Sequence, residues 1–216
     1  MNLSTGAELR ITGITNDCAV VCLNGGQSRA VEGTWSASSS GWSVPLAPRL
    51  PGLGFAEVRY RVKSWKQLES CVEDARAAVQ EVGASRTVLL GFSMGGAVSV
   101  AIANERSVEE VLGLAPWIPA ELDVTTLRGK RLTVLHGSLD RWLPGLPGVS
   151  ASHSRHGFDR ARERGADGRY EVIPWALHGI AVRAPWGKLV ALPRAGLWAE
   201  LVEAELRRFA AAHSPG

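Results

Sequence analysis

The chain has few cysteines and no long apolar run, and each shortage excludes a class of protein. Only three cysteines occur in 216 residues, and so sparse and odd a set argues against the disulfide framework of a small secreted domain. The best apolar stretch, residues 95–103, is about half of the roughly 20 residues that a bilayer-spanning helix needs. Residues 1–10 lack a basic segment followed by an apolar one, so we expect no signal peptide. These features predict a cytoplasmic protein with no membrane as partner.

Motifs for nucleotides and metals are also missing. The 24 glycines form neither the G-x-G-x-x-G pattern nor the phosphate-binding G-x-x-x-x-G-K-[ST] pattern. Cys18 and Cys22 fall in one apolar run, and no second Cys/His group has zinc-site spacing. We therefore expect no cofactor and no metal.

Positive charge is present but dispersed. The chain has 24 basic and 21 acidic residues. Its densest basic cluster, residues 155–164, is interrupted by Asp159 and Glu163, which is typical of a solvated helix face rather than a phosphate-binding strip. Nucleic acid is not expected as a partner.

What the chain does have is a globular composition, 45% hydrophobic and 21% charged, and a regular alternation of short apolar runs with longer amphipathic stretches. The apolar runs that predict strands are 18–23, 55–60, 87–91, 111–114, 132–135 and 170–173, with 8–14 as a candidate edge strand. Helices are predicted at 66–82, directly after Ser93, within 153–165 and at 195–212, while 36–50 stays ambiguous because prolines interrupt it. The order predicts one α/β domain over residues 1–216, a doubly wound and mostly parallel sheet of about six to seven strands flanked by helices.

A serine in a tight turn is the strongest chemical signal. Residues 91–95 read Gly-Phe-Ser-Met-Gly, a G-x-S-x-G pattern between a buried strand and a helix rich in small residues. Such a turn lifts the serine Oγ above the sheet, and the helix that begins at Met94 directs free backbone N–H groups toward an oxyanion. Ser93 is therefore the candidate nucleophile.

With this motif and its strand–helix order, the sequence resembles the α/β-hydrolase superfamily, and two further motifs fit the same resemblance. Residues 135–140, Leu-His-Gly-Ser-Leu-Asp, imply that Asp140 is the triad acid, and residues 173–179, Ile-Pro-Trp-Ala-Leu-His-Gly, imply that His178 is the general base. The order Ser93, Asp140, His178 is that of the superfamily. His136 is the nearest alternative base, but its place in the turn at a strand end favours a structural role.

The oxyanion donors follow from the same resemblance. They would be the N–H of Met94 and one N–H from the loop after the first central strand, Asn24-Gly25-Gly26-Gln27. Gly26 is the expected donor and Gln27 the alternative by one residue. Asn24 stands where the superfamily commonly has histidine.

The surroundings of the site are less well determined. Residues 115–131 are too short for a helical cap, so we expect no large lid. In this respect the chain is similar to dienelactone-hydrolase-like members of the superfamily. Those enzymes have cysteine where this chain has Ser93, which argues against lactone activity. Three tryptophans that follow predicted strand ends either line an acyl or aromatic pocket or pack at the core and rim: Trp117, Trp142 and Trp175.

The expected function is that of a serine hydrolase that cleaves small carboxylic esters through an acyl-enzyme intermediate, with a small-molecule ester as its partner. Thioesterases and amidases use the same residues, and a non-catalytic ligand-binding protein on this scaffold is the alternative from another class. The sequence does not indicate the oligomeric state.

Overall fold

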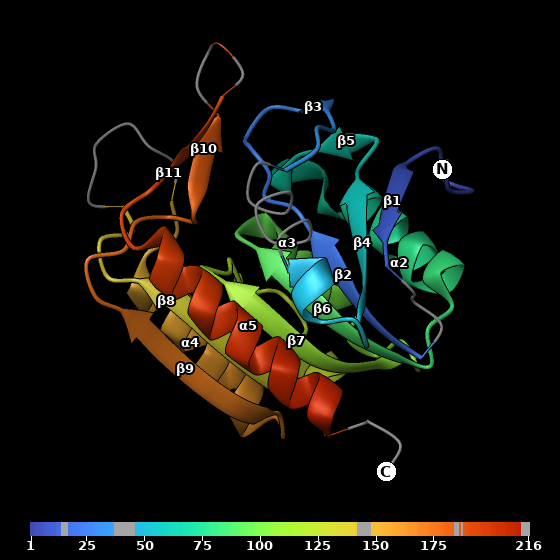
Figure 1. Cartoon of the computed structure of the whole chain (residues 1–216). Helices are drawn as coiled ribbons and strands as arrows, with labels where there is room; N and C mark the ends of the chain where they lie inside the picture. The colour runs from blue at the N-terminus through green and yellow to red at the C-terminus, as the bar shows by residue number, and fades with distance from the viewer. Residues whose placement is uncertain (14–16, 37–45, 142–147, 184–185, 187, 213–216) are drawn as a thin grey trace.

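The computed structural model describes residues 1–13, 17–36, 46–141, 148–183, 186 and 188–212. Seven strands form one sheet in the order β1-β4-β2-β6-β7-β8-β9 (Figure 1). Only β1 is antiparallel to its neighbour, so the expected mostly parallel sheet is confirmed. The strands are β1 (Glu8–Thr12), β2 (Cys18–Leu23), β4 (Gly54–Arg59), β6 (Arg86–Phe92), β7 (Val108–Leu114), β8 (Arg131–Gly137) and β9 (Asp167–Ile173).

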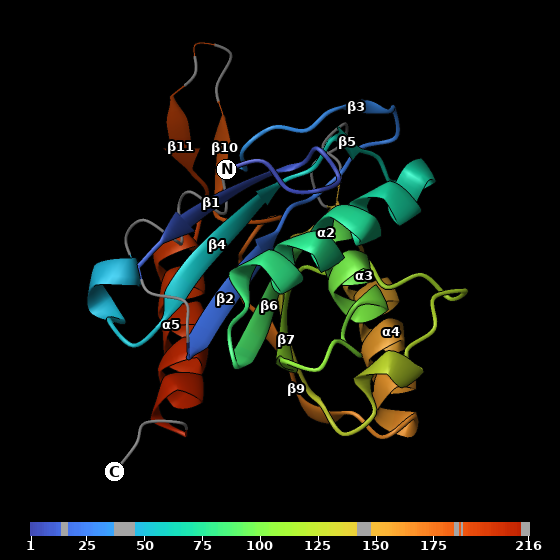
Figure 2. The ribbon, with the colours of Figure 1, turned by 90° about the vertical axis from the view of Figure 1, so that its right-hand side faces the viewer.

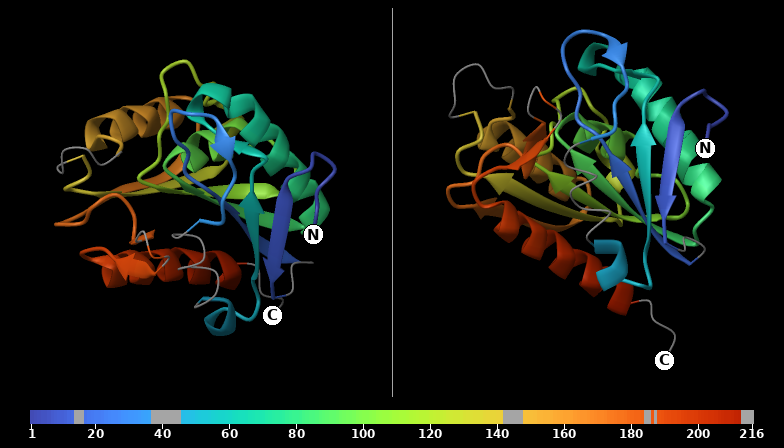
Figure 3. Two further views of the ribbon diagram at one scale, coloured as in Figure 1. Left: turned by 90° about the horizontal axis from the view of Figure 1, so that it is seen from above. Right: turned by 45° about the horizontal axis from the view of Figure 1, so that its top comes forward.

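Helices cover both faces of the sheet. Seen from above, α2 (Leu68–Val82), α3 (Met94–Ala101) and α4 (Ala151–Glu163) lie on one side and α5 (Ala195–Ala211) on the other (Figure 3). Two apolar cores result, one beneath the three helices and one beneath α5, where Trp198 and Phe209 are fully buried. Because both faces are covered, the central strands are continuously apolar, as in β2, whose six residues are all buried.

The predicted helix at 66–82 shows how the local sequence sets its own limits. Its first two residues belong to a 3₁₀ turn, η2 (Trp65–Gln67), and the α-helix begins at Leu68. Cys71, Ala75 and Val79 recur every fourth residue and are buried against the sheet. Gly83 ends the helix with φ of 60°, a left-handed conformation that favours glycine.

Some expectations need correction. The edge strand predicted at 8–14 ends at Thr12, because Gly13 has φ of 85° and turns the chain. In the ambiguous segment, η1 (Ala47–Arg49) is a single 3₁₀ turn, and residues 37–45 lie outside the described part. Two small antiparallel pairs had not been predicted: β3 (Val31–Glu32) with β5 (Val62–Lys63), and β10 (Ala181–Arg183) with β11 (Leu189–Ala191). No helix among the described residues is long and apolar enough to cross a membrane.

The strand order identifies the edge of the sheet where a ligand belongs. β2 lies between β4 and β6, so the chain moves to one side of β2 and then crosses to the other. Doubly wound sheets bind ligands at such a reversal, beyond the carboxyl ends of the strands. The loop after β2 and the turn after β6 flank this point, and the turn contains Ser93.

A charged cluster joins α5 to the sheet. Glu205 is 7% exposed and accepts hydrogen bonds from Arg169 Nε at 3.1 Å and from Arg208 Nε at 3.2 Å. Arg208 also pairs with Glu110 of β7, and Arg169 with Glu171 of β9. Burial acts to raise the pKa of Glu205, but the two guanidinium groups outweigh it and hold that pKa below its usual value.

We expect Glu205→Gln to lower the free energy of unfolding by about 1–2 kcal/mol at pH 7, because Arg169 and Arg208 lose a shared carboxylate that is itself buried, although both guanidinium groups are partly solvated. The folded pKa of Glu205 lies below the unfolded one. Its contribution is therefore present above an unfolded pKa of about 4.3 and is lost as the pH falls through the folded pKa. Urea unfolding at pH 7 and at about pH 3 should show the difference from wild type shrinking at the lower pH.

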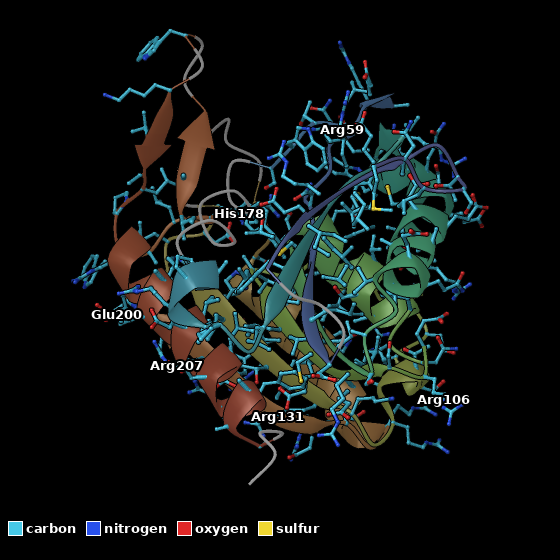
Figure 4. All side chains as sticks on the ribbon, turned by 45° about the vertical axis from the view of Figure 1, so that its right-hand side comes forward. Arg59, Arg106, Arg131, His178, Glu200 and Arg207 are labelled. Atoms are coloured by element: carbon cyan, nitrogen blue, oxygen red, sulfur yellow. The ribbon has the colours of Figure 1, made fainter. Side chains whose placement is uncertain are left out.

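The matched control is Glu200→Gln, because Glu200 is exposed on the same helix (Figure 4). Its effect should stay within about 0.5 kcal/mol at both pH values. Equal losses in the two variants would contradict the proposed role of the Glu205 cluster.

Candidate active site

Ser93 sits in a strained turn between β6 and α3. Its φ of 53° and ψ of −117° are unfavourable for a residue with a Cβ atom. The backbone of Ser93 is fixed by three hydrogen bonds: its N–H donates to Leu114 O, and its carbonyl accepts from the N–H groups of Gly96 and Trp117, all at 2.9–3.0 Å. These hydrogen bonds hold Ser93, just after the end of β6, in a backbone conformation that is unfavourable without them.

Backbone strain gathers at this same edge of the sheet. Among the described residues other than glycine, five have positive φ, and four of these come at or just beyond the end of β6, β7, β8 or β9. These four are Ser93, Ala115, Arg141 and Trp175. Strained non-glycine residues cluster at functional sites, where the surrounding structure holds them in place. The carboxyl ends of the strands are therefore the strongest candidate for a site.

The loop after β2 packs directly against the serine turn. A Cβ atom on Gly95 would lie 2.0 Å from Leu23 O, so only glycine allows the turn to approach β2 so closely. A Cβ on Gly26 would lie 2.2 Å from Met94 Sδ, and one on Gly25 would lie 3.4 Å from Ser93 Cβ. Both predicted oxyanion donors, Gly26 and Met94, thus belong to segments in contact.

Asn24 anchors this loop. It is buried, and its Nδ2 donates to Val58 O of β4 at 2.8 Å. The side chain at this position therefore ties the loop to the sheet, a role that explains why a buried amide stands here.

Asp140 and His178 meet although 38 residues separate them. Asp140 lies in the turn after β8, and His178 in the loop after β9. His178 Nδ1 is 2.6 Å from Asp140 Oδ2, and the Asp140 side chain is only 1% exposed. A buried carboxylate requires donors, so His178 Nδ1 carries a proton, and in the neutral form of the ring the lone pair is on Nε2.

His136 contacts the same carboxylate. Its Nε2 is 3.2 Å from Asp140 Oδ2 and 3.0 Å from Val149 O, while the N–H of Val149 donates to Asp140 Oδ1 at 3.1 Å. Within the described residues, His136 Nδ1 has no hydrogen-bonding partner. His136 therefore carries its proton on Nε2 and helps to fix Asp140, which agrees with the structural role expected for it.

These contacts control the ionisation of Asp140. Burial acts to raise its pKa, but the hydrogen bonds from His136 and His178 and their charges outweigh burial, and the pKa lies below its usual value. Asp140 is therefore a carboxylate throughout the neutral range.

His178 also contacts the serine turn. Its ring packs on that of Phe92, the residue before Ser93, with centroids 4.8 Å apart and planes tilted by 42°. Among the hydrogen bonds of the described residues, none joins Ser93 to His178. Hydrogen bonds between catalytic side chains are often long in enzymes without substrate and shorten when substrate binds, so we expect Ser93 Oγ and His178 Nε2 to approach each other in a substrate complex.

The three tryptophans differ in their surroundings. Trp117 is partly buried and packs against the apolar core, so its side chain belongs at least in part to the fold. The Trp175 side chain is 65% exposed, and the backbone N–H of Trp175 donates to Ser138 Oγ at 2.9 Å. Trp142 lies outside the described residues.

Within the described residues, no group of three or more His, Cys, Asp or Glu side chains could hold a metal ion.

The sheet order and the serine turn together define an α/β-hydrolase fold, and solved structures agree. No protein-family model matches the sequence, and no curated protein does. The fold is similar to that of a sugar hydrolase from Lactococcus lactis, with a TM-score of 0.70, 15% identity and 96% of each chain covered.

Two further solved structures have a similar fold. A serine hydrolase without a lid from Xanthomonas campestris has a TM-score of 0.65 and 14% identity, with 100% of this chain and 94% of that chain covered. An esterase from Exiguobacterium antarcticum has a TM-score of 0.63 and 12% identity, with 97% and 98% covered. At these identities the likeness shows the fold, and the chemistry must be argued from the site.

Proposed function

We propose that this protein is a serine hydrolase that cleaves small carboxylic esters through an acyl-enzyme intermediate. The observation that carries the proposal is the 2.6 Å contact between His178 Nδ1 and the buried carboxylate of Asp140. The same His178 ring packs on Phe92, beside the strained backbone of Ser93. The expected triad order and the fold shared with esterases support the same reading.

The proposed reaction has two halves. Ser93 Oγ attacks the ester carbonyl while His178 Nε2 takes the hydroxyl proton, and the alcohol leaves with that proton as the tetrahedral intermediate collapses. Water then attacks the acyl-serine, again giving its proton to His178, and Ser93 recovers it as the acid departs. Asp140 keeps the proton on Nδ1 and stabilises the imidazolium that forms twice in each turnover.

The N–H groups of Met94 and Gly26 are the proposed oxyanion donors. Met94 is the first residue of α3, where a backbone N–H has no partner within the helix. Gly26 itself lies against Met94, since a Cβ atom on Gly26 would be 2.2 Å from Met94 Sδ, and this proximity supports Gly26 over Gln27. Each such donor typically contributes on the order of 3 kcal/mol to transition-state stabilisation.

A fluorophosphonate probe tests the nucleophile directly. We expect one adduct on the folded protein, located at Ser93 by peptide mapping, and no adduct on Ser93→Ala. An adduct on another serine, or none on folded wild type, would overturn the proposal and would favour the alternative of a non-catalytic ligand-binding protein.

Matched substrates separate the ester reading from the thioesterase and amidase alternatives. An acetate ester, a thioacetate and an acetanilide share the acyl group and differ in the leaving group. We expect the highest kcat/KM on the ester. Faster turnover of the thioester or anilide would assign the same residues to the corresponding alternative.

The pH dependence of kcat/KM tests His178 as a general base. Because a general base acts in its deprotonated form, we expect kcat/KM to rise about tenfold per pH unit on the acid side and to level off through about pH 6–7.5, the range in which imidazoles lose a proton. The lowered pKa of Asp140 keeps that carboxylate ionised over this interval, so one ionisation should suffice. A profile that is flat from pH 5 to 8 would contradict the role of His178.

A further inference from the structure

One segment of the chain has basic residues and no acidic ones. Residues 172–199 contain no Asp or Glu but have Arg183, Lys188 and Arg194. The whole chain has 24 basic and 21 acidic residues, so the rest of the chain has 21 of each and is formally neutral. The formal charge of this segment, +3, equals the net charge of the whole chain.

The same segment is rich in exposed apolar side chains. Seven large apolar side chains of the described residues are exposed, and four of them lie between residues 172 and 190. Trp186 is 77% exposed, Trp175 65%, Val172 47% and Val190 43%. Isolated exposed apolar residues are ordinary, but these four occur within 19 residues that contain no acidic side chain.

The β10–β11 hairpin presents part of this segment away from the molecule. Its base is fixed, because Ile180 is buried in the core beneath α5 and accepts a hydrogen bond from Leu192 N at 2.7 Å. Beyond the base the two strands stand out from the body past the carboxyl edge of the sheet (Figures 1 and 2). Three residue pairs join them. A two-stranded hairpin of this size is marginal in water by itself, so a surface that covers it would stabilise it.

We propose that the β10–β11 hairpin docks on an anionic lipid–water interface, with Trp186 as the inserted side chain and Lys188 as a headgroup contact. Indole rings favour the boundary between headgroups and acyl chains, and basic side chains are attracted to anionic headgroups. Peripheral docking of this kind needs no spanning helix. The proposal replaces the expectation, drawn from the lack of a spanning stretch, that no membrane is a partner.

An acidic protein surface fits these features less well. A partner protein would recognise a shaped apolar face, whereas the exposed side chains here come from a strand edge, a turn and a projecting hairpin. A fluid interface accepts such separated anchors. Docking would also bring the candidate site to the interface, because His178 lies near the base of the hairpin (Figure 4).

Co-sedimentation with lipid vesicles tests the proposal. We expect the full-length protein to bind vesicles of 70% phosphatidylcholine and 30% phosphatidylglycerol, with little binding to phosphatidylcholine alone. Raising the salt from 0.05 to 0.5 M should weaken binding, since the Debye length shortens from about 14 to about 4 Å. Trp186→Ser and Lys188→Glu should each lower the partition coefficient by about tenfold or more.

The chain offers a matched control pair at another place on its surface. Trp65 and Lys66 are an exposed tryptophan and lysine in the η2 turn, and Trp65→Ser and Lys66→Glu should bind vesicles as wild type does. Brominated phosphatidylcholine mixed into the anionic vesicles should quench wild-type tryptophan fluorescence, and Trp186→Ser should lose most of that quenching.

Several outcomes would overturn the proposal. These are no binding by wild type, equal losses in both pairs of variants, equal binding to neutral vesicles, or binding to a soluble polyanion such as heparin without binding to vesicles. None of these measurements requires turnover, so a failure of the proposed hydrolase activity would leave their result unchanged.

Discussion

Ser93→Ala is expected to lower kcat for a short-chain ester by about 10⁵–10⁶-fold, because the proposed acyl-enzyme cannot form without the Ser93 hydroxyl. The residual rate would come from water attacking a carbonyl that the proposed oxyanion donors still polarise. Alanine keeps the Cβ atom of serine, so the strained backbone with φ of 53° is unchanged. We therefore expect the variant to fold with wild-type stability, and initial rates with a nitrophenyl acetate measure the loss.

Ser152→Ala is the matched control, since Ser152 is an exposed serine in the first turn of α4. Its kcat should equal that of wild type. A Ser93→Ala enzyme that retained a tenth of the wild-type rate would show that another group attacks the ester. Ser93→Gly adds a check on strain: glycine tolerates this backbone, so the protein should become more stable while it stays inactive.

The fold could be predicted because its central strands are apolar on both faces. Residues 18–23 are continuously apolar since β2 is covered on both sides, and the sequence range equals the observed strand. The helices at 66–82 and 195–212 were predictable for a related reason, because each buries one face at three- and four-residue spacing. The β10–β11 hairpin has no such signal, because each of its strands has only three residues, too few to show a periodic pattern.

The candidate site was less predictable, because its contacts join distant segments. The H-G-x-x-D motif places His136 four residues before Asp140. The motif does not indicate that His136 and His178 both contact the Asp140 carboxylate. The backbone donor at Val149 carries no side-chain signal at all. Phe92 was visible only as the variable position of a motif, although its ring packs on His178.

Asp140→Asn should lower kcat by about 10⁴-fold with little change in KM, because the amide disturbs the tautomer of His178. The carboxylate faces three N–H donors: His178 Nδ1, His136 Nε2 and Val149 N. An asparagine that keeps its oxygen toward Val149 turns its NH₂ group toward the two imidazoles. His178 must then move its proton to Nε2 to offer Nδ1 as an acceptor, and it loses the lone pair that should receive the Ser93 proton.

The control for charge alone is Asp167→Asn, at an exposed aspartate that pairs with Arg162 at the start of β9. Its kcat should be unchanged. If Asp140→Asn kept more than a tenth of the wild-type kcat, or if it still reacted with the fluorophosphonate at the wild-type rate, the carboxylate would not be setting the tautomer of the base. Slow reaction at Ser93 together with a retained fold would instead locate the defect in proton transfer, since the nucleophile and the loop after β2 are untouched by the substitution.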